Sequence, residues 1–228
     1  HVLIINDGGG PSTYNLTTNI STTDDFALQN GALLQQGAFN ISTADDFNMS
    51  GTSKFTGGTG GLDIGGRLDL GSGAAGNFTA PTGAFTIVGN WNNTGAMAVT
   101  MTGSNVVFDG STQFIKSNGK AFHDVTFNSI AAPGANDFVL SDAFSAANDV
   151  TITSGDFDLS FAAFGASIGR DLVVNGGSII GGTGTFNVDR NIDINAGAFT
   201  APSGTFTLAG DCDHGGGTVT MTGSTLTF

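Results

Sequence analysis

Short stretches of alternating apolar and polar residues recur along the chain, each introduced by Asp, Asn or Arg. Examples are DFAL at 25–28, DFNM at 46–49 and RLDL at 67–70. An alternation with a period of two is typical of a β-strand that buries one of its faces. The introducing residues are Asp25, Asp46, Arg67, Asn90, Asp124, Asp149, Asp171, Asn191 and Asp211, with a degenerate step near Val107. The mean spacing of this series is about 21 residues, which is within the range of solenoid repeats.

A second apolar series lies a few residues upstream of the first. Its members are Phe39, Leu62, Phe85, Phe186 and Phe206. Two or three short strands per repeat, separated by corners rich in Gly, Asn and Asp, are typical of a solenoid coil. We therefore predict an all-β fold, a parallel β-helix (β-solenoid) of about ten coils, right-handed as parallel crossovers are. The alternative is one β-sandwich or two, which would need hairpin turns and would give no side-chain column at this period.

A longer repeat encloses the short one. FTAPTGAFTI at 78–87 returns as FTAPSGTFTL at 199–208, and HVLIIN at 1–6 aligns with HDVTFN at 123–128. The chain thus divides into a first solenoid repeat unit, 1–122, and a continuous but incomplete second unit, 123–228. Phe228 aligns with Phe108, so the second unit lacks a counterpart of 109–122. We expect the array to continue in a longer protein, or a neighbouring subunit to supply the missing part.

Composition disfavours helices and several classes of partner. All 19 acidic residues are Asp, and Gly accounts for 37 residues, which favours turns and strands over helices. A net charge of −13 argues against binding to nucleic acid or to anionic membranes. No apolar run approaches the ~18 residues that span a bilayer. The single Cys permits no internal disulfide.

Three segments resemble a known kind of repeat. They are VVFDGSTQFI at 106–115, FHDVTFN at 122–128 and GNWNNTG at 89–95. Together they resemble the tandem repeats of very large secreted bacterial surface proteins of the adhesin type. The resemblance implies a β-solenoid on or outside the cell with an adhesive, matrix or fibre role, and it brings no catalytic residues with it.

The candidate metal ligands are two acidic pairs, Asp24-Asp25 and Asp45-Asp46, which lie one short repeat apart. On adjacent coils these carboxylates repel one another unless a cation such as calcium bridges them. The alternative is a solvated corner in which each Asp bonds its own backbone. GGTGGLDIG at 57–65 resembles a calcium-binding nonapeptide, but its Asp comes one place late, so a tight Gly corner is the better interpretation.

The remaining reactive residues point to structure rather than catalysis. Cys212 stands in the place of Trp91 of the first unit, an inward position that predicts a buried small hydrophobe. Asp156 and Asp158 alternate along a strand and are expected to face water. Six scattered Lys and Arg residues and an uninterrupted repeat argue against a polysaccharide-cleaving β-helix enzyme. We therefore predict no enzymatic activity and no cofactor, with calcium as the one candidate ion.

Two functions remain. The first is a structural segment of an extracellular fibre or cell-surface adhesin stalk, whose partner is a further copy stacked head to tail or a covalent continuation of the array. Its basis is that neither end shows a polar cap: residues 2–5 are apolar and 225–228 form a bare strand. The second is a module that binds surface glycans or a receptor, which predicts an exposed aromatic patch in one unit only. Tyr14 and Trp91 are the candidate aromatics, and Trp91 is expected to point inward.

Overall fold

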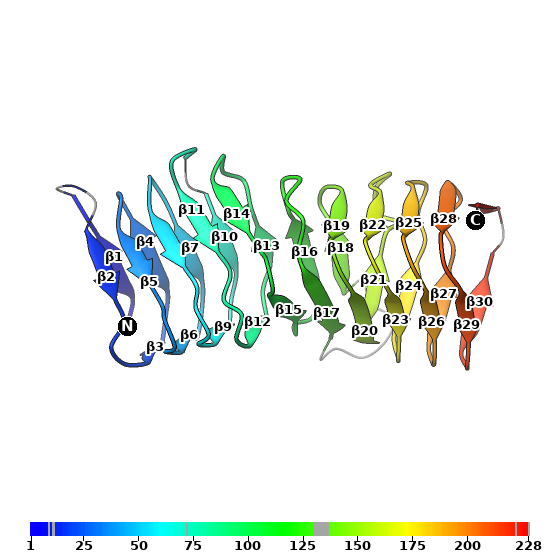
Figure 1. Ribbon diagram of the computed structural model, residues 1–228, viewed down its shortest axis with the longest axis horizontal. Coiled ribbons are helices and arrows are strands. Elements are labelled where there is room, and N and C mark those ends of the chain that lie inside the picture. The colour runs from blue at the N-terminus through cyan, green and yellow to red at the C-terminus, as the bar shows by residue number, and fades with distance from the viewer. Residues whose placement is uncertain (9, 11, 72, 130–136, 222, 228) are drawn as a thin grey trace. The chain divides into compact units, whose positions relative to one another are not determined.

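The computed structural model describes residues 1–8, 10, 12–71, 73–129, 137–221 and 223–227. Within these ranges the regular elements are short β-strands, and no helix occurs. The strands wind as a parallel β-solenoid of about ten coils (Figure 1). The predicted fold class is therefore confirmed, while its handedness stays a prediction. Phe228, which the sequence aligns with Phe108, lies outside the described residues.

The chain forms two compact units, His1–Val106 (unit 1) and Val107–Phe228 (unit 2). Strand β15 (Asn105–Phe108) spans this boundary. The boundary between the two compact units is defined by how the chain packs. The predicted boundary between residues 122 and 123 is instead a boundary of the sequence repeat. The repeat boundary therefore stays a prediction.

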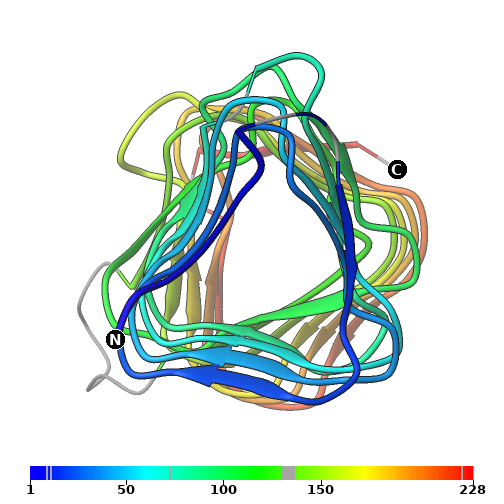
Figure 2. The same ribbon diagram turned by 90° about the vertical axis from the view of Figure 1, so that its left-hand side faces the viewer.

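Unit 1 has three strands in each coil, one on each side of a triangle (Figure 2). Face 1A consists of β1 (Leu3–Asn6), β4 (Phe26–Gln29), β7 (Phe47–Met49), β10 (Leu68–Leu70) and β13 (Trp91–Asn92). Face 1B consists of β2 (Thr13–Asn15), β5 (Leu33–Gln35), β8 (Lys54–Thr56), β11 (Asn77–Thr79) and β14 (Ala98–Thr100). Face 1C consists of β3 (Ile20–Thr22), β6 (Ile41–Thr43), β9 (Leu62–Ile64) and β12 (Phe85–Ile87).

Unit 2 also winds over three faces, although its first coil has a strand on only two of them. Face 2A consists of β16 (Gln113–Lys116), β18 (Phe138–Leu140), β21 (Asp156–Asp158), β24 (Ser178–Ile180), β27 (Ala198–Thr200) and β30 (Thr218–Thr220). Face 2B consists of β19 (Phe144–Ala146), β22 (Ala166–Ile168), β25 (Phe186–Val188), β28 (Thr205–Leu208) and β31 (Thr225–Thr227). Face 2C consists of β17 (Asp124–Asn128), β20 (Val150–Ser154), β23 (Leu172–Val174), β26 (Ile192–Ile194) and β29 (Cys212–His214).

Like side chains stack on one another inside each unit, as the sequence period predicts. On face 1A, Phe26 is in register with Phe47, and the next two coils place Leu68 and Trp91 in the same column. The rings of Phe26 and Phe47 stack with their centroids 5.0 Å apart, and both side chains are fully buried. Burying each such side chain contributes about 1.5–3 kcal/mol. Because neighbouring coils cover the apolar side chains of each coil from both sides, stability depends on stacking.

The stacked interior of unit 2 is equally aromatic. The ring centroid of Phe127 lies 4.7 Å from that of Phe138 and 4.7 Å from that of Phe157. All three side chains are buried. Further along, Phe186 stacks on Phe206 at 5.5 Å. Both units are therefore filled by columns of Phe and branched aliphatic residues.

Two details of the predicted columns are wrong. The single series from Asp25 to Asp211 joins two sets of strands: its early members introduce strands of face 1A, and its members from Asp124 onward introduce or begin strands of face 2C. In the second series Phe39 lies between strands and is half-buried, and Ile41 is the residue in register with Leu62. The corner before β6 is longer than the pattern suggested, so the strand starts two residues later.

Candidate functional site

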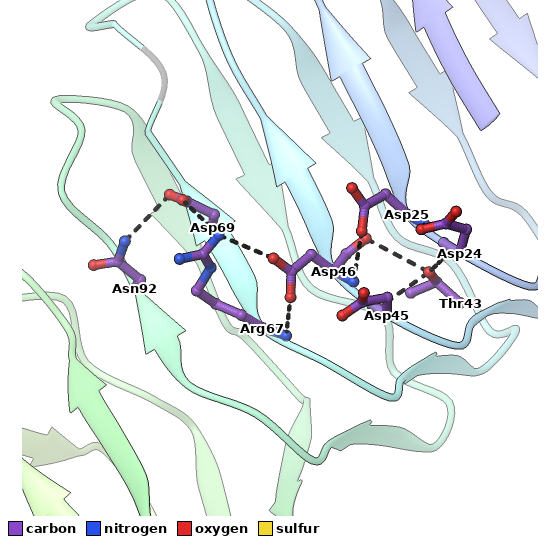
Figure 3. Close-up of polar contacts among 8 residues, drawn as sticks. All are labelled: Asp24, Asp25, Thr43, Asp45, Asp46, Arg67, Asp69 and Asn92. Atoms are coloured by element: carbon purple, nitrogen blue, oxygen red, sulfur yellow. Dashed lines mark hydrogen bonds and ion pairs between the residues drawn. The ribbon is translucent and has the colours of Figure 1, made fainter. Parts of the chain in front are cut away.

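The acidic corner is made by Asp24, Asp25, Asp45 and Asp46, which precede β4 and β7 of face 1A (Figure 3). The register of these strands places the two pairs on adjacent coils, as the sequence predicts. Asp24 and Asp25 are half-buried, and Asp45 is exposed. Within the described residues Asp24, Asp25 and Asp45 form the one group of three potential ligands, with a carboxylate oxygen of each within 4.8 Å of the others.

Asp46 is turned away from this group and toward the following coil. Its Oδ1 accepts the backbone N–H of Arg67 at 2.6 Å, and its Oδ2 lies 2.9 Å from Nη2 of the same Arg67. That guanidinium also lies 3.8 Å from the carboxylate of Asp69. Of the four predicted calcium ligands, the structure therefore brings three together and pairs the fourth with an arginine.

Like charges act most strongly on Asp45. The carboxylate of Asp46 is the largest influence, followed by burial and by the carboxylates of Asp25 and Asp24, and together they raise the pKa of Asp45 above its usual range. Arg67 opposes this shift. Calcium takes about six to eight oxygen ligands, so three carboxylates would leave several places for water. The corner has the charge that a divalent cation requires, and calcium binding stays a prediction.

The same carboxylates also bond the backbone of the next coil. Asp25 Oδ1 accepts the N–H of Asp46 at 3.2 Å, just as Asp46 accepts that of Arg67. We call such a series, in which a corner Asp or Asn accepts the N–H of the equivalent residue one coil later, an Asx ladder. The alternative interpretation, in which each Asp bonds its own backbone, misses this step between coils.

Unit 2 carries the longer Asx ladder, along the start of face 2C. Asp124 accepts the N–H of Asp149 at 3.1 Å, Asp149 that of Asp171 at 3.1 Å, Asp171 that of Asn191 at 3.0 Å, and Asn191 that of Asp211 at 3.0 Å. Asn191 takes the place that Asp holds on the other coils, because the position needs only a side-chain oxygen. This interchange is the signal from which the ladder could have been predicted.

Arginines partly neutralise this acidic ladder. Arg170 lies 3.7 Å from the carboxylate of Asp149, and Arg190 lies 3.5 Å from that of Asp171. All four side chains are partly exposed to solvent, so each pair contributes at most about 1 kcal/mol. We therefore assign the basic residues of this edge to charge compensation.

At the first step of the ladder His123 adds a contact that the sequence reasoning missed. Its Nδ1 lies 2.7 Å from Oδ2 of Asp124. Burial would raise the pKa of Asp124, but hydrogen bonds from the N–H of Asp149, from the amide of Asn148 and from His123 outweigh it and lower the pKa. The adjacent His and Asp in the sequence were the available signal. We infer that this pair stabilises the corner of the coil.

Cys212 is not buried, contrary to the sequence prediction. It does occupy an inward column, in register with Ile192, but it is exposed because no described coil stacks over β29. Burial against its own coil, followed by the charges of Asp213 and Asp193, raises the pKa of the thiol. A raised pKa disfavours the thiolate, which is the reactive form.

Asp156 and Asp158 are also buried rather than solvated, and this corrects a second prediction. Their side chains are 6% and 2% exposed. Oδ1 of Asp158 accepts the N–H and the hydroxyl of Ser160 at 2.7 and 2.6 Å, and the N–H of Asp156 donates to Asp137. Asp158 therefore bonds the turn that follows β21 instead of facing open water.

The Gly-rich residues 57–61 form a tight corner before β9, as the simpler interpretation predicts. A Cβ on Gly58 would lie 2.0 Å from the carbonyl oxygen of Gly37, and one on Gly60 would lie 2.0 Å from that of Phe39. Leu62, which follows, is fully buried. Glycine is therefore explained here by the close approach of two coils.

The two candidate aromatics differ in exposure as predicted, since Trp91 is expected to point inward, and a binding surface stays a prediction. Trp91 is buried, with 2% of its surface exposed, and Tyr14 is 37% exposed. The most exposed large apolar side chain of the described residues is instead Phe161, at 68%. It lies in the connection between β21 and β22, and the sequence reasoning overlooked it.

Among the described residues no helix is long and apolar enough to cross a membrane. The chain was compared with protein-family models, with curated proteins and with solved structures, and none of them matches it.

Proposed function

We propose that this chain is a structural segment of an extracellular fibre or of a cell-surface adhesin stalk, in which coils stack end to end. The observation that carries the proposal is the unbroken stacking inside each unit. In unit 2, Phe138, Phe157, Ile179, Phe199 and Val219 follow one another in register on face 2A. A molecule whose interior is one repeated contact can be lengthened by adding coils, which is what a spacer or fibre needs.

The coil formed by β29, β30 and β31 supports the end-to-end part of the proposal. Its inward-pointing residues Cys212, Val219 and Leu226 continue the columns of Ile192, Phe199 and Phe206, yet they are exposed or half-buried. A further coil placed on them would bury them as the earlier members are buried. That coil could come from the same polypeptide or from another copy.

The charge of the surface fits the same role. The net charge is −13, and acidic side chains line the corners of successive coils in the Asx ladders before face 1A and along the start of face 2C. Such a surface repels other copies that approach from the side. Stacking through the apolar ends is then favoured over lateral clumping.

Electron microscopy of the purified chain tests the assembly. End-to-end stacking predicts filaments or short chains of particles whose length grows with protein concentration. Val219→Asp, which puts a charge on the exposed column, should abolish this growth, while Asp193→Asn on an outward position should leave it unchanged. If only single particles are seen at every concentration, separate copies do not stack end to end.

Surface labelling tests the location. Antibodies raised against the chain should bind intact, unpermeabilised cells of the organism that makes it, and external protease should remove the signal. Labelling only after permeabilisation would contradict the extracellular role. Denaturing electrophoresis of the same cells would show whether the chain is part of a longer polypeptide.

A further inference from the structure

Among the described residues, two coils are stacked on one side only. The first coil consists of β1, β2 and β3, drawn in dark blue in Figure 2, and each of these is the outermost strand of its sheet. The last coil consists of β29, β30 and β31, and each of these is also outermost in its sheet. Each of the two coils therefore presents a backbone edge and a set of inward side chains that no described coil covers.

The inward side chains of the first coil are apolar and incompletely buried. Tyr14 is in register with Leu34, which is fully buried, yet Tyr14 is 37% exposed. Leu3 and Ile20 also lie in columns whose next members are fully buried, yet both are only half-buried. Tyr14 therefore belongs to an interior column that stops at this coil, and not to an outward surface.

The sequence repeat shows which faces of the two coils are equivalent. Three aligned pairs relate unit 1 to unit 2: Trp91 with Cys212, Phe78 with Phe199, and Phe85 with Phe206. These pairs match face 1A with face 2C, face 1B with face 2A, and face 1C with face 2B. If the first coil of one copy lies on the last coil of another with equivalent faces aligned, every interior column continues without a break.

We propose that the last coil of one copy binds the first coil of the next in this register, with β1 on β29, β2 on β30 and β3 on β31. The inference rests on the proposed end-to-end stacking and adds the partner surface and its alignment. The register stacks three pairs of inward side chains: Leu3 on Cys212, Tyr14 on Val219, and Ile20 on Leu226. The larger side chains of the first two pairs meet smaller ones, as an interdigitated core requires.

The backbone fits the same register. Parallel pairing of β29 with β1 of the next copy continues the pairing that each already makes inside its own copy, and it satisfies groups left open at both edges. The Asx ladder of face 2C also gains a step. Asn191 accepts the N–H of Asp211 at 3.0 Å, and Asp211 would accept that of Val2, which aligns with the ladder residue Asp25.

Charge favours this head-to-tail contact over contact between two last coils. Residues 1–22 contain one Asp and no Lys or Arg, so the first coil is nearly uncharged apart from its end group. The outward Asp213 of the last coil would then lie beside Ile4 of the next copy. Two last coils placed together would instead bring Asp211 and Asp213 of both copies close to one another, and such like charges repel.

A disulfide reads the register directly, because Cys212 is the single cysteine of the chain. In the proposed register the Cα atoms of Leu3 and Cys212 lie about 4.8 Å apart, within the roughly 4.4–6.8 Å that a disulfide spans. Mild oxidation of Leu3→Cys should therefore give a ladder of covalent oligomers on non-reducing denaturing electrophoresis. Ile4→Cys, whose side chain points outward, should give no ladder, and neither should Leu3→Cys combined with Cys212→Ser.

Two further variants guard against a disulfide that fails for reasons of folding or geometry. Tyr14→Cys with Val219→Cys, in a Cys212→Ser background, tests the second pair and should give the same ladder. Tyr14→Ala should raise the protein concentration needed for assembly about tenfold, since it removes a ring that the contact buries. Thr13→Ala, at the outward position beside it, should leave that concentration within about twofold.

The outcomes separate the register from the stacking itself. Filaments of the unchanged chain with no ladder from either cysteine pair would keep end-to-end stacking and overturn the register. A ladder from Leu3→Cys with Leu226→Cys in the Cys212→Ser background would show a docking rotated by one face, which also overturns it. Oxidised products that stop at dimers would indicate contact between like ends and contradict the proposal. Single particles at every concentration would overturn the register and the stacking of copies together.

Discussion

The carboxylate of Asp171 accepts a hydrogen bond from the backbone N–H of Asn191, 3.0 Å away on the following coil. Asn191 makes the same bond to Asp211 one coil later, also at 3.0 Å. The ladder therefore uses the side-chain oxygen and not the charge. Each step satisfies a backbone donor at a corner, where the regular pairing of the strands has not yet begun.

Replacing Asp171 separates the contribution of the side-chain hydrogen bond from the contribution of the negative charge. We expect Asp171→Ala to cost about 1–2 kcal/mol, because the N–H of Asn191 loses its acceptor. Asp171→Asn should cost less than about 0.5 kcal/mol, since it retains an oxygen and loses only an exposed pair with Arg190. Hydrogen exchange at the Asn191 amide measures the effect directly, with Asp193→Ala as the matched control. Equal losses for Asn and Ala would show that charge, not the hydrogen bond, matters.

The sequence predicts the coil and its interior because both depend on side-chain periodicity. Phe26, Phe47, Leu68 and Trp91 form one column in the structure, one residue from each successive coil, and all are buried. An inward position tolerates only apolar side chains of suitable size, so it leaves a mark in the sequence that is easy to detect.

The placement of each strand on a particular face is not predictable in the same way. A strand introduced by Asp or Asn occurs on face 1A in unit 1 and on face 2C in unit 2, because more than one corner of a coil can use an Asx side chain. The period alone therefore does not identify the face on which each strand lies. The same holds for Asp158, which is buried and whose carboxylate accepts a hydrogen bond from Ser160 in the connection after β21, beyond its own strand.

Phenylalanine stacking in unit 2 can be tested at Phe127, which contacts two other rings at 4.7 Å. We expect Phe127→Ala to destabilise the protein by about 3–5 kcal/mol, because it removes a buried ring and leaves a cavity. Phe127→Leu should cost clearly less. Urea unfolding measures both, and Phe161→Ala, at an exposed position, should change stability by no more than about 0.5 kcal/mol. Equal costs at Phe127 and Phe161 would contradict the stacked interior.

Close approach of coils can be tested at Gly60. A Cβ there would lie 2.0 Å from the carbonyl oxygen of Phe39, so Gly60→Ala forces two coils apart and should cost about 1–3 kcal/mol. Gly73 is the matched control, because the nearest atom to its Cβ would be the carbonyl oxygen of Gly51 at 3.6 Å. Thermal unfolding of the two variants should separate them clearly. A stable Gly60→Ala protein would show that this corner adjusts without strain.

The acidic corner makes stability depend on pH through Asp45. Its pKa is higher in the folded than in the unfolded chain, chiefly because of Asp46, so the folded state binds more protons between the two values. Stability therefore falls as pH rises through that window and stays lower at neutral pH. We expect Asp45→Asn to raise the melting temperature at pH 7 and to have no effect below about pH 3, where the unfolded carboxyl is also protonated. A lower melting temperature at pH 7 would contradict the repulsion.

Calcium offers a second way to relieve the same repulsion. If Asp24, Asp25 and Asp45 bind the ion together, calcium at ten times its dissociation constant should stabilise the folded state by about 1.4 kcal/mol. For a chain of this size that corresponds to a rise of roughly 3–6 °C in melting temperature. EDTA should reverse the rise, Asp45→Asn should abolish it, and Asp63→Asn, outside the corner, should preserve it. The same melting temperature with millimolar calcium and with EDTA would leave the corner as a repulsive cluster that only Arg67 moderates.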